Sequence, residues 1–359
     1  MRLLIYGARS LALGAYRAIQ ELYPQTPVEG FLVTSLEGNP SVLAGLPVQE
    51  IGVFAAQIEP GAKEELHILI AAPEDQHAGM IQTAEGLGCC HYTCLDSRKE
   101  SRLVERYYAQ QQIFPSLHNL EPGTEQAGLS ILMAQFYKDR PLKGGFAAPG
   151  WIHPIQVGAA LTDTRVSGLT DDTGENISAK NVNYCELTAL YWLWKNRLTS
   201  NFCDSEYFGL FHYRRILDLT ETDLLRLKAH DVDAVLPFPT LHEPDALEHH
   251  RRYISELDWE AMSRALKELH PEYARALPQI FAQPYLYNYN LILAKKKILA
   301  DYCAWLFPVL ERTEQLSQPR GWERRDRYIG YLGENLLTLY FRKRRAELKL
   351  YHTGRLMLT

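Results

Sequence analysis

The first hundred residues alternate between short apolar runs and stretches with helical spacing. Three apolar runs have the length of strands: residues 2–7, 28–34 and 67–72. Between the first two, apolar residues recur from Leu13 to Leu22 at the spacing of one helix face. Alternation of this kind is typical of a parallel sheet with helical crossovers, so the pattern predicts a Rossmann-like domain over residues 1–107.

The first turn of this domain lacks the glycine pattern of a dinucleotide site. After Gly7 the next glycine is Gly14, so the glycine that lets a pyrophosphate approach the backbone is missing. This argues against an NAD site, and therefore against an NAD-dependent oxidoreductase. At the level of the fold alone, the region resembles the small N-terminal domain of bacterial sugar acyltransferases, which holds nucleotide-linked sugars.

Irregular sequence separates this region from the rest of the chain. Proline, glycine and glutamine interrupt any regular period between about residues 107 and 147. We therefore expect a linker at 108–128 and a second, mixed α/β domain at 129–359 that begins with a strand at 129–136. The helices expected after it lie at 184–197, after a cap at Thr220, in two or three segments up to 281, at 296–315 and at 326–344. The expected strands lie at 207–213, 232–236 and 285–293.

The helix expected at 184–197 has a regular apolar face. Leu187, Leu190 and Trp194 fall on one side of it. Asn183 would cap this helix, with Glu186 three residues further on as in a capping box.

Composition and charge narrow the class of protein. The net charge is −5, and acidic and basic residues are interleaved without a polybasic arm or acidic tail, so no nucleic-acid partner is expected. The N-terminal apolar run is too short for a signal peptide, and no run reaches the length of a membrane span, so an intracellular, soluble protein is expected. The six cysteines lack metal-binding spacing and are expected to be reduced and mostly buried.

One segment departs from this even distribution of charge. Basic residues follow one another at 342–345, with Lys349 and Arg355 beyond them. They could lie against an anionic membrane surface in a peripheral contact. A solvated helix face is the alternative.

A basic pair follows the apolar run YFGLFHY. With the two-residue period of a strand, His212 and Arg214 would lie on one side. Tyr213 and Arg215 would lie on the other. Arginine keeps its charge and donates several hydrogen bonds in one plane, so this pair would neutralise a diphosphate without a metal ion. The alternative is structural: one arginine pairs with a carboxylate such as Asp218, and His212 is a core histidine.

A polar loop precedes the predicted helix at 184–197. Such a loop is costly to order unless something binds there, and carboxylates, amides and a helix N-terminus are groups that contact sugar hydroxyls and phosphates. A turn-rich surface loop is the alternative. The candidate substrate-binding residues of the loop are Asp171, Asp172, Asn176, Lys180 and Asn181.

Two later segments supply further candidates. Asn290 ends the run YNYN just before an apolar strand end, where an acceptor could lie. Asp326, Gly330 and Glu334 share one face of a predicted helix, with Arg327 beside them. Glu334 is the carboxylate expected to act as base or acceptor ligand, although a surface ion pair would explain it as well.

No metal site is predicted. His242, His249 and His250 contain no i, i+4 pair, and no Asp-x-Asp follows a predicted strand. A divalent cation such as Mn²⁺ or Mg²⁺ is therefore not firmly implied.

Several of these motifs, taken in order, resemble a known family. From about residue 129 onward the chain resembles bacterial surface-polysaccharide glycosyltransferases grouped as domain of unknown function 4422. One departure is that Gln135 to Lys138 stand where the family usually has a Thr-His-Lys-like turn, so contacts to the donor base are not carried over. The matching segments are 153–162, 171–196, 207–215, the strand at Asn290, 302–307 and 327–337.

The resemblance implies a GT-A-like fold and a glycosyltransferase that uses a nucleotide sugar, with a UDP-sugar favoured. The acceptor would be a glycan or lipid-linked glycan of a capsule, exopolysaccharide or lipopolysaccharide, at the cytosolic face of the membrane. Some members resemble galactose or galactofuranose transferases. Arg214, Arg215 and His212 would then lie at the diphosphate, and Glu334 would serve the acceptor. The alternative hypothesis is a non-catalytic nucleotide-sugar-binding or assembly scaffold protein.

Overall fold

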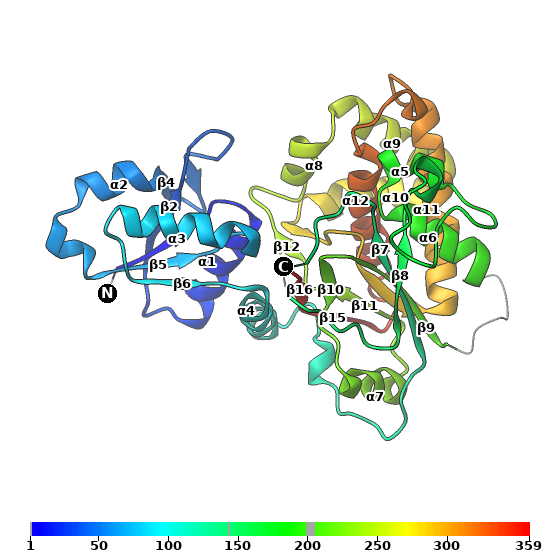
Figure 1. The fold of residues 1–359 in the computed structure, drawn as a ribbon, viewed down its shortest axis with the longest axis horizontal. Helices are drawn as coiled ribbons and strands as arrows, with labels where there is room; N and C mark the ends of the chain where they lie inside the picture. Colours follow the sequence, from blue (N-terminus) through cyan, green and yellow to red (C-terminus); the bar gives the residue numbers. More distant parts are fainter. Residues whose placement is uncertain (1, 143, 199–204) are drawn as a thin grey trace.

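The chain folds into two lobes, which are seen side by side in Figure 1. The computed structural model describes residues 2–142, 144–198 and 205–359, so Cys203 lies outside the described residues. Within those ranges, one lobe is built on a six-stranded sheet and the other on an eight-stranded sheet, and a two-stranded sheet lies apart from both.

The N-terminal lobe has the Rossmann-like arrangement that the apolar runs predict. The sheet order is β3-β4-β2-β1-β5-β6, and β1 pairs in parallel with both β2 and β5. The strands are β1 (Arg2–Tyr6), β2 (Val28–Val33), β3 (Val42–Leu43), β4 (Leu46–Glu50), β5 (Leu66–Ile70) and β6 (Tyr92–Cys94). The helices of this lobe are α1 (Ser10–Leu22), α2 (Ile51–Gln57) and α3 (His77–Gly86).

Gly7 ends the first strand in a conformation that favours glycine. Its φ is +140°, and a Cβ at this position would lie 2.3 Å from the carbonyl oxygen of Ala71. The glycine is therefore required for close packing of the first turn against the end of β5.

The C-terminal lobe has a mixed α/β, GT-A-like sheet. Strands β8, β7, β9, β14, β11 and β15 lie side by side, and β14 runs antiparallel to both of its neighbours. β10 pairs with the end of β9 and with β16. The bounds are β7 (Leu129–Gln135), β8 (Ile152–Gln156), β9 (Tyr207–His212), β10 (Arg215–Leu217), β11 (Ala234–Pro237), β14 (Ile292–Lys295), β15 (Leu350–Thr353) and β16 (Arg355–Met357).

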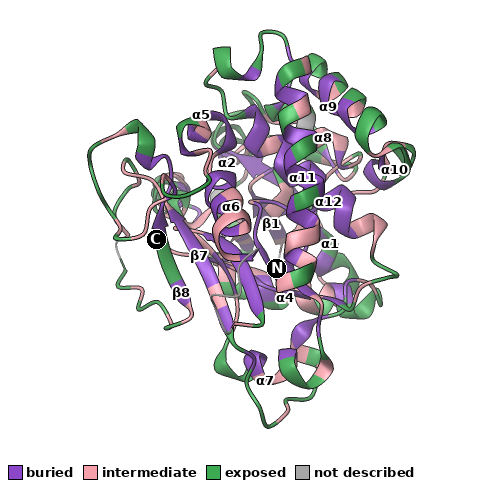
Figure 2. Ribbon diagram, turned by 90° about the vertical axis from the view of Figure 1, so that its right-hand side faces the viewer, coloured by how far each residue is buried: buried purple, intermediate pink, exposed green. Residues whose placement is uncertain are grey.

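Helices cover this larger sheet and close its core. The first group is α5 (Asn181–Tyr184), α6 (Leu187–Leu193), α7 (Glu221–His230) and α8 (Leu247–Tyr253). The second is α9 (Glu256–Leu269), α10 (Pro271–Phe281), α11 (Lys296–Leu316) and α12 (Tyr328–Lys343). Figure 2 shows buried residues along β7 and much of α12, which lie in the middle of the lobe. The described part of the chain contains no helix with the length and apolar character that crossing a bilayer requires.

The predicted helix at 184–197 is interrupted, contrary to the sequence pattern. Cys185 has a φ of +51° between α5 and α6, and a π turn follows at Trp194–Leu198. Asn183 therefore does not cap a helix; its side-chain amide donates to the carbonyls of Gly321 and Arg324. The break at Cys185 turns residue 186 inward. Packing against α12 therefore outweighs helix propensity in this segment.

The strand predicted at 285–293 is also divided. Tyr285–Leu286 form β13, which pairs with β12 (Thr240–Leu241), and β14 begins only at residue 292. Between them Tyr289 and Asn290 have φ values of 69° and 50°. The run YNYN is therefore an irregular turn and not part of a strand.

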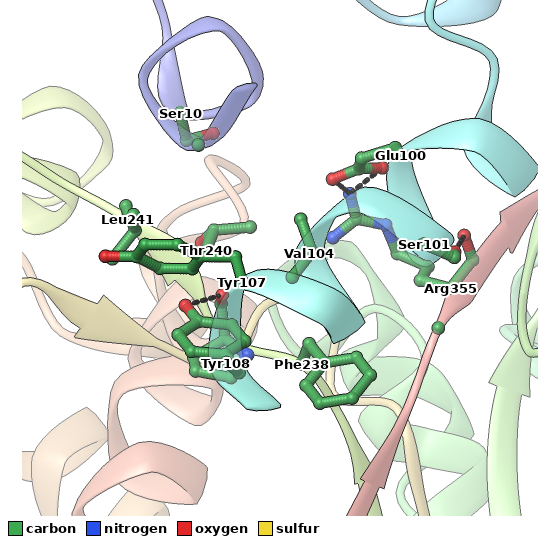
Figure 3. Close-up of a pocket in the computed structure, with 13 residues that line it drawn as sticks. Ser10, Glu100, Ser101, Val104, Tyr107, Tyr108, Phe238, Thr240, Leu241 and Arg355 are labelled. Carbon is green, nitrogen blue, oxygen red and sulfur yellow. Dashed lines mark hydrogen bonds and ion pairs between the residues drawn. The ribbon is translucent and has the colours of Figure 1, made fainter. Parts of the chain in front are cut away.

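Helix α4 (Ser97–Gln110) joins the two lobes. Its Tyr108 hydroxyl donates to the carbonyl of Pro239 at 2.8 Å, and its Glu100 forms a 3.3 Å ion pair with Arg355 (Figure 3). The cavity between these groups is about 30 Å³, which holds about one or two water molecules. Leu241 of β12 is packed into the core of the N-terminal lobe. The lobes therefore share a packed junction.

The basic residues of the C-terminal segment have different partners. Arg355 is largely buried by its pair with Glu100, whereas Lys349 contacts the carbonyl of His230. Arg344 pairs with Glu347, and Arg342 donates to Gln283. These separate contacts do not test a membrane contact, which stays a prediction.

The cysteines are free thiols in the described residues. Cys89 and Cys303 are buried, whereas Cys94 and Cys185 are half-buried and Cys90 is exposed. Fewer of the described cysteines are buried than the sequence led us to expect.

Candidate active-site cleft

A cleft of about 1390 Å³ lies between the two lobes. In the N-terminal lobe it is lined by residues 6–11, which follow β1, and by residues 71–73, which follow β5. In the C-terminal lobe it is lined by Asp139, beyond β7, and by residues 212–215 at the end of β9. The carboxyl ends of parallel strands in both sheets thus open onto one space, which is where α/β proteins bind ligands.

The residues His212-Tyr213-Arg214-Arg215 form a tight hairpin at this cleft. β9 ends at His212, and Arg215 pairs with it as the first residue of antiparallel β10. The prediction of one continuous strand with alternating sides was wrong, because the chain reverses at Tyr213 and Arg214. The reversal brings all four residues to the cleft.

The two hairpin arginines have different partners. Arg214 Nη1 lies 3.2 Å from Asp75 Oδ2, in the N-terminal lobe, so it does pair with a carboxylate, as the structural alternative expected, although with Asp75 and not with Asp218. Its Nε is buried without a hydrogen-bond partner among the described residues. Arg215 lies 4.3 Å above the ring of Tyr289, and Arg355 lies 5.0 Å from the same ring. The hairpin therefore presents two guanidinium groups with hydrogen-bonding capacity left over.

His212 is a neutral group in this setting. Burial, together with the charges of Arg215 and Arg214, lowers its pKa to about 3. Its Nδ1 is buried and has no hydrogen-bond partner in the described residues. His212 therefore adds no positive charge near a diphosphate, but its ring can still donate or accept one hydrogen bond.

A buried carboxyl pair, Glu186 and Glu334, lies at the base of the cleft. Burial, and then the charge of Glu186, raises the pKa of Glu334 to about 8. Burial also raises the pKa of Glu186, whose Oε1 accepts from Asn290 Nδ2 at 2.7 Å. The positive φ of Asn290 aims its amide at this carboxyl and at the carbonyl of Gly330. Asn290 thus positions a carboxyl group of the cleft.

Asp139 and Arg327 complete the wall beside the hairpin. Asp139 accepts a 2.7 Å hydrogen bond from the backbone N–H of Phe136, and burial raises its pKa to about 6. Arg327 precedes α12 in a left-handed conformation with φ +66°, and its Nε donates to Cys185 Sγ. Asp326 lies outside α12 and pairs with Arg324, so it does not share a helix face with Glu334.

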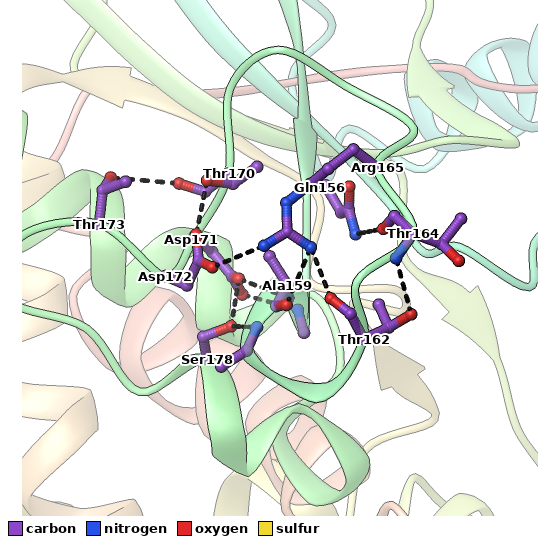
Figure 4. A network of polar contacts seen from close by, with 12 residues as sticks. Gln156, Ala159, Thr162, Thr164, Arg165, Thr170, Asp171, Asp172, Thr173 and Ser178 are labelled. Atoms are coloured by element: carbon purple, nitrogen blue, oxygen red, sulfur yellow. Dashed lines mark hydrogen bonds and ion pairs between the residues drawn. The ribbon is translucent and has the colours of Figure 1, made fainter.

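The polar loop before α5 lies outside the cleft lining. Asp171 is fully buried and accepts hydrogen bonds from the backbone N–H groups of Gly158 and Ala159, at 2.9 and 3.1 Å, and from the Ser178 hydroxyl (Figure 4). Asp172 pairs with Arg165. Neither carboxylate lines the cleft, and both bind the protein's own backbone and side chains.

The remaining loop candidates are engaged in the same way. Asn176 bonds within its own turn, to the carbonyl of Gly174 and the N–H of Ser178. Lys180 Nζ lies 2.6 Å from Glu314 Oε2. Asn181 donates to the carbonyl of Cys185 and to the Thr188 hydroxyl. Lys180 and Asn181 thus connect the loop to α11 and α6, and none of the three side chains lines the cleft.

Several cleft residues were not singled out from the sequence. The sequence pattern assigned Glu186 to a capping box of a continuous helix, and that assignment does not predict a side chain that lines the cleft. Asp139 directly follows the turn at Gln135 to Lys138. The only sequence signal for its place in the cleft is that this turn lies at the end of a strand. Asn288 and Tyr289 belong to the run YNYN, where an acceptor was expected, and Arg355 was assigned to the basic C-terminal segment. Other cleft residues that the sequence did not indicate include Arg9, Arg252, Tyr253 and Tyr331.

The chemistry of the hairpin does not suit a divalent cation. GT-A enzymes commonly hold such an ion with Asp-x-Asp at a strand end, whereas two arginines stand here and would repel it. In the described residues no group of three or more His, Cys, Asp or Glu side chains is arranged to hold a metal ion. The side chains of His249 and His250 lie outside what the structure describes.

Comparison with known proteins shows a solved structure with a similar fold and a family that matches the chain. No curated protein matches the chain. Among solved structures, the chain is similar to the apo structure of the WbbM bifunctional glycosyltransferase, with a TM-score of 0.53 and 25% sequence identity. The similarity covers 65% of this chain and 45% of that chain, so it spans less than half the length of WbbM. Residues 146–345, which are more than half of the chain, match the family described as domain of unknown function 4422 (DUF4422), and the chain therefore belongs to that family.

Proposed function

We propose that the chain is a glycosyltransferase that moves a sugar from a nucleotide diphosphate to a glycan during polysaccharide synthesis. The observation that carries the proposal is the hairpin at the end of β9, which turns Arg214 and Arg215 into a cleft that also holds buried carboxyl groups. Membership of the DUF4422 family and the similarity to the WbbM glycosyltransferase support it.

The arginines would stabilise the leaving group. When the bond between the sugar C1 and the diphosphate oxygen breaks, negative charge grows on the diphosphate. Arg214, Arg215 and Arg327 line one region of the cleft and keep their charge at any working pH. Fixed guanidinium groups in a partly dry site stabilise such charge without reorganisation, and each donor is worth on the order of 3 kcal/mol. We therefore propose transfer that needs no divalent cation.

A carboxylate would accept the proton of the attacking hydroxyl. The acceptor oxygen forms a bond to C1, the bond from C1 to the diphosphate breaks, and the hydroxyl proton passes to the base. We assign this role to Glu334, whose pKa near 8 makes it a strong base once it is ionised. Asp139, with a pKa near 6, is the second candidate.

The substrates are proposed from the resemblance to the family, and the lining of the cleft is compatible with them. The donor is a nucleotide sugar, with a UDP-sugar favoured and galactose or galactofuranose as the transferred group. The acceptor is a capsule, exopolysaccharide or lipopolysaccharide glycan, free or lipid-linked, at the cytosolic face of the membrane. The extensive polar and aromatic lining of the cleft supports such ligands.

Calorimetry with UDP-, GDP- and dTDP-sugars tests the proposal. The full chain should bind one of these donors equally well with EDTA and with Mn²⁺, and Arg214→Gln should lose that binding. Arg312→Gln, which removes a surface arginine paired with Glu268, is the matched control. Binding that requires Mn²⁺ and ignores Arg214→Gln would overturn the metal-free assignment. Donor binding without donor consumption in the presence of a lipid-linked glycan would favour a non-catalytic binding protein.

A further inference from the structure

A stacked pair of tyrosines lines the cleft in addition to the hairpin. Tyr253 ends α8 and Tyr331 lies in the first turn of α12, and their ring centroids are 4.9 Å apart with an interplanar angle of 20°. Both residues line the cleft, and Tyr253 is 50% exposed. Flat aromatic surface that stays open in a polar cleft suits the C–H face of a sugar ring.

Two arginines from different lobes line the same cleft as this pair. Arg252 precedes Tyr253 in α8, and Arg9 comes from the turn after β1. Arg252 forms a 2.8 Å pair with Glu248, whereas Arg9 donates to the backbone carbonyl of Gly38 and forms no ion pair in the described part of the chain. Both arginines line the cleft, and burial together with the charge of Arg252 lowers the pKa of Arg9. Like charges held together favour an anionic ligand.

The position of Arg9 has a topological reason. β2 and β5 lie on opposite sides of β1, so the chain leaves β1 in one direction and later returns on the other side. The crevice between the ends of β1 and β5 is therefore the switch point of this sheet, where open α/β folds bind ligands. The turn that carries Arg9 begins at this crevice.

The cleft is large enough for a second substrate. Its volume of about 1390 Å³ exceeds the roughly 300–1,000 Å³ of a typical small-molecule site. If the donor diphosphate lies on the hairpin, the surface formed by Arg9, Arg252, Tyr253 and Tyr331 is left for the molecule that attacks the donor. Glu334 lies in the same cleft as this surface and near Tyr331.

We propose that Tyr253, Tyr331, Arg9 and Arg252 form the acceptor subsite, and that it takes a sugar bearing a negatively charged group. The tyrosines stack on the sugar ring and the arginines bind its phosphate or carboxylate. The N-terminal lobe thus completes the acceptor site. This inference rests on the proposed glycosyltransferase function.

Binding measurements on the full chain test the subsite while a nucleotide occupies the hairpin, so that the sugar does not compete for the donor position. With the hairpin occupied by whichever of UDP, GDP and dTDP binds, glucose 1-phosphate, glucuronate and glucose are titrated by calorimetry. At least one charged sugar should bind about 10-fold or more tightly than glucose. Which of the two does so separates a phosphate-bearing acceptor from an acidic sugar.

Variants then locate the binding. Arg9→Gln and Arg252→Gln should each weaken the charged sugar about 10-fold and leave nucleotide affinity unchanged, and Tyr253→Ala should weaken charged and neutral sugars alike. Arg17→Gln, on α1 and paired with Glu243, is the control in the same lobe. Melting temperatures identify any variant that fails to fold.

The outcomes separate the two proposals. If both arginine variants bind the charged sugar as tightly as wild type, the subsite is overturned. It is also overturned if these variants lose nucleotide affinity, because that loss would place the donor on this surface. If no nucleotide binds but charged sugars bind in an Arg9-dependent way, the surface is a charged-sugar site, its role as an acceptor subsite is overturned, and the glycosyltransferase proposal fails.

Discussion

Arg214 and Asp75 form a 3.2 Å ion pair that crosses the cleft from the hairpin to the N-terminal lobe. The guanidinium proposed to hold the donor diphosphate is thus already engaged by a carboxylate of the other lobe. Both side chains are partly exposed, so the pair itself contributes on the order of 1 kcal/mol or less. A diphosphate carries more charge than one carboxylate and would displace Asp75 from Arg214.

Removing the Asp75 charge should therefore strengthen donor binding. Asp75→Asn frees Arg214 and removes a negative charge near the diphosphate, so we expect a gain in nucleotide-sugar affinity of about two- to five-fold, corresponding to the modest strength of an exposed pair. Calorimetry at two salt concentrations measures it, and the gain should shrink at high salt. Glu64→Gln, an exposed change in the same lobe, should have no effect. If Asp75→Asn leaves nucleotide-sugar affinity unchanged, Arg214 does not bind the donor diphosphate.

The geometry of Arg214 should matter as well as its charge. Arg214→Lys keeps the charge but loses the planar fork that binds two phosphate oxygens together. We expect kcat/KM to fall about 10² to 10³-fold in Arg214→Gln, and by less in Arg214→Lys. Equal losses in the two variants would contradict a bidentate role.

The pH dependence of turnover should identify the base. If Glu334 accepts the proton, kcat rises with pH through a limb near 8; if Asp139 does, the limb lies near 6. Glu186→Gln removes a neighbouring charge that helps to raise the pKa of Glu334, so a Glu334 limb should move to lower pH in that variant. A limb near 6 that Glu186→Gln leaves in place would assign the base to Asp139.

Stability should respond to the same carboxyl group. Glu334 has a folded-state pKa raised above that of an unfolded chain, so the folded state binds the extra proton between about pH 4.5 and 8. The free energy of unfolding should therefore fall as pH rises through this window, by about 1.4 kcal/mol per pH unit from this group. Glu334→Gln cannot ionise, and urea unfolding across the window should show a smaller slope. An unchanged slope would mean that Glu334 is ionised in the folded protein.

The sequence pattern predicts those features of the fold that rest on local periodicity. The apolar strands of the N-terminal sheet and the long helices α11 and α12 lie close to where periodicity places them. The basic run at 212–215 does reach the cleft, although as a hairpin. Features decided by distant contacts were missed. Cys185 interrupts a regular helical pattern because Glu186 must reach Asn290, which lies far away in the sequence.

Burial of polar groups is the other feature that the sequence alone does not specify. Asp171 and Glu334 are both acidic residues that the sequence indicates as candidate site residues, yet one anchors a backbone turn and the other lines the cleft. Only the fold decides which backbone N–H groups come near each carboxylate. The side chains of the loop at 171–181 bind the loop and its neighbours, and this removes the argument that only a ligand could order it.

Asp171 should accordingly be required for stability and not for donor binding. Its carboxylate is fully buried and accepts hydrogen bonds from Gly158, Ala159 and Ser178. In Asp171→Asn the new amide nitrogen faces backbone N–H donors, so at least one of these donors loses its acceptor. We expect the free energy of unfolding to fall by about 2–4 kcal/mol, since each hydrogen bond to a charged group contributes roughly 1.5–3 kcal/mol. Urea unfolding and thermal melting measure this loss.

The matched control is the next residue. Asp172 is partly exposed and pairs with Arg165, so Asp172→Asn should cost less than about 1 kcal/mol. Nucleotide affinity, expressed per folded molecule, should match wild type in both variants, because neither side chain lines the cleft. If Asp171→Asn instead kept its melting temperature and lost nucleotide binding, the carboxylate would contact the donor, and the donor site would have to extend from the hairpin to the loop before α5.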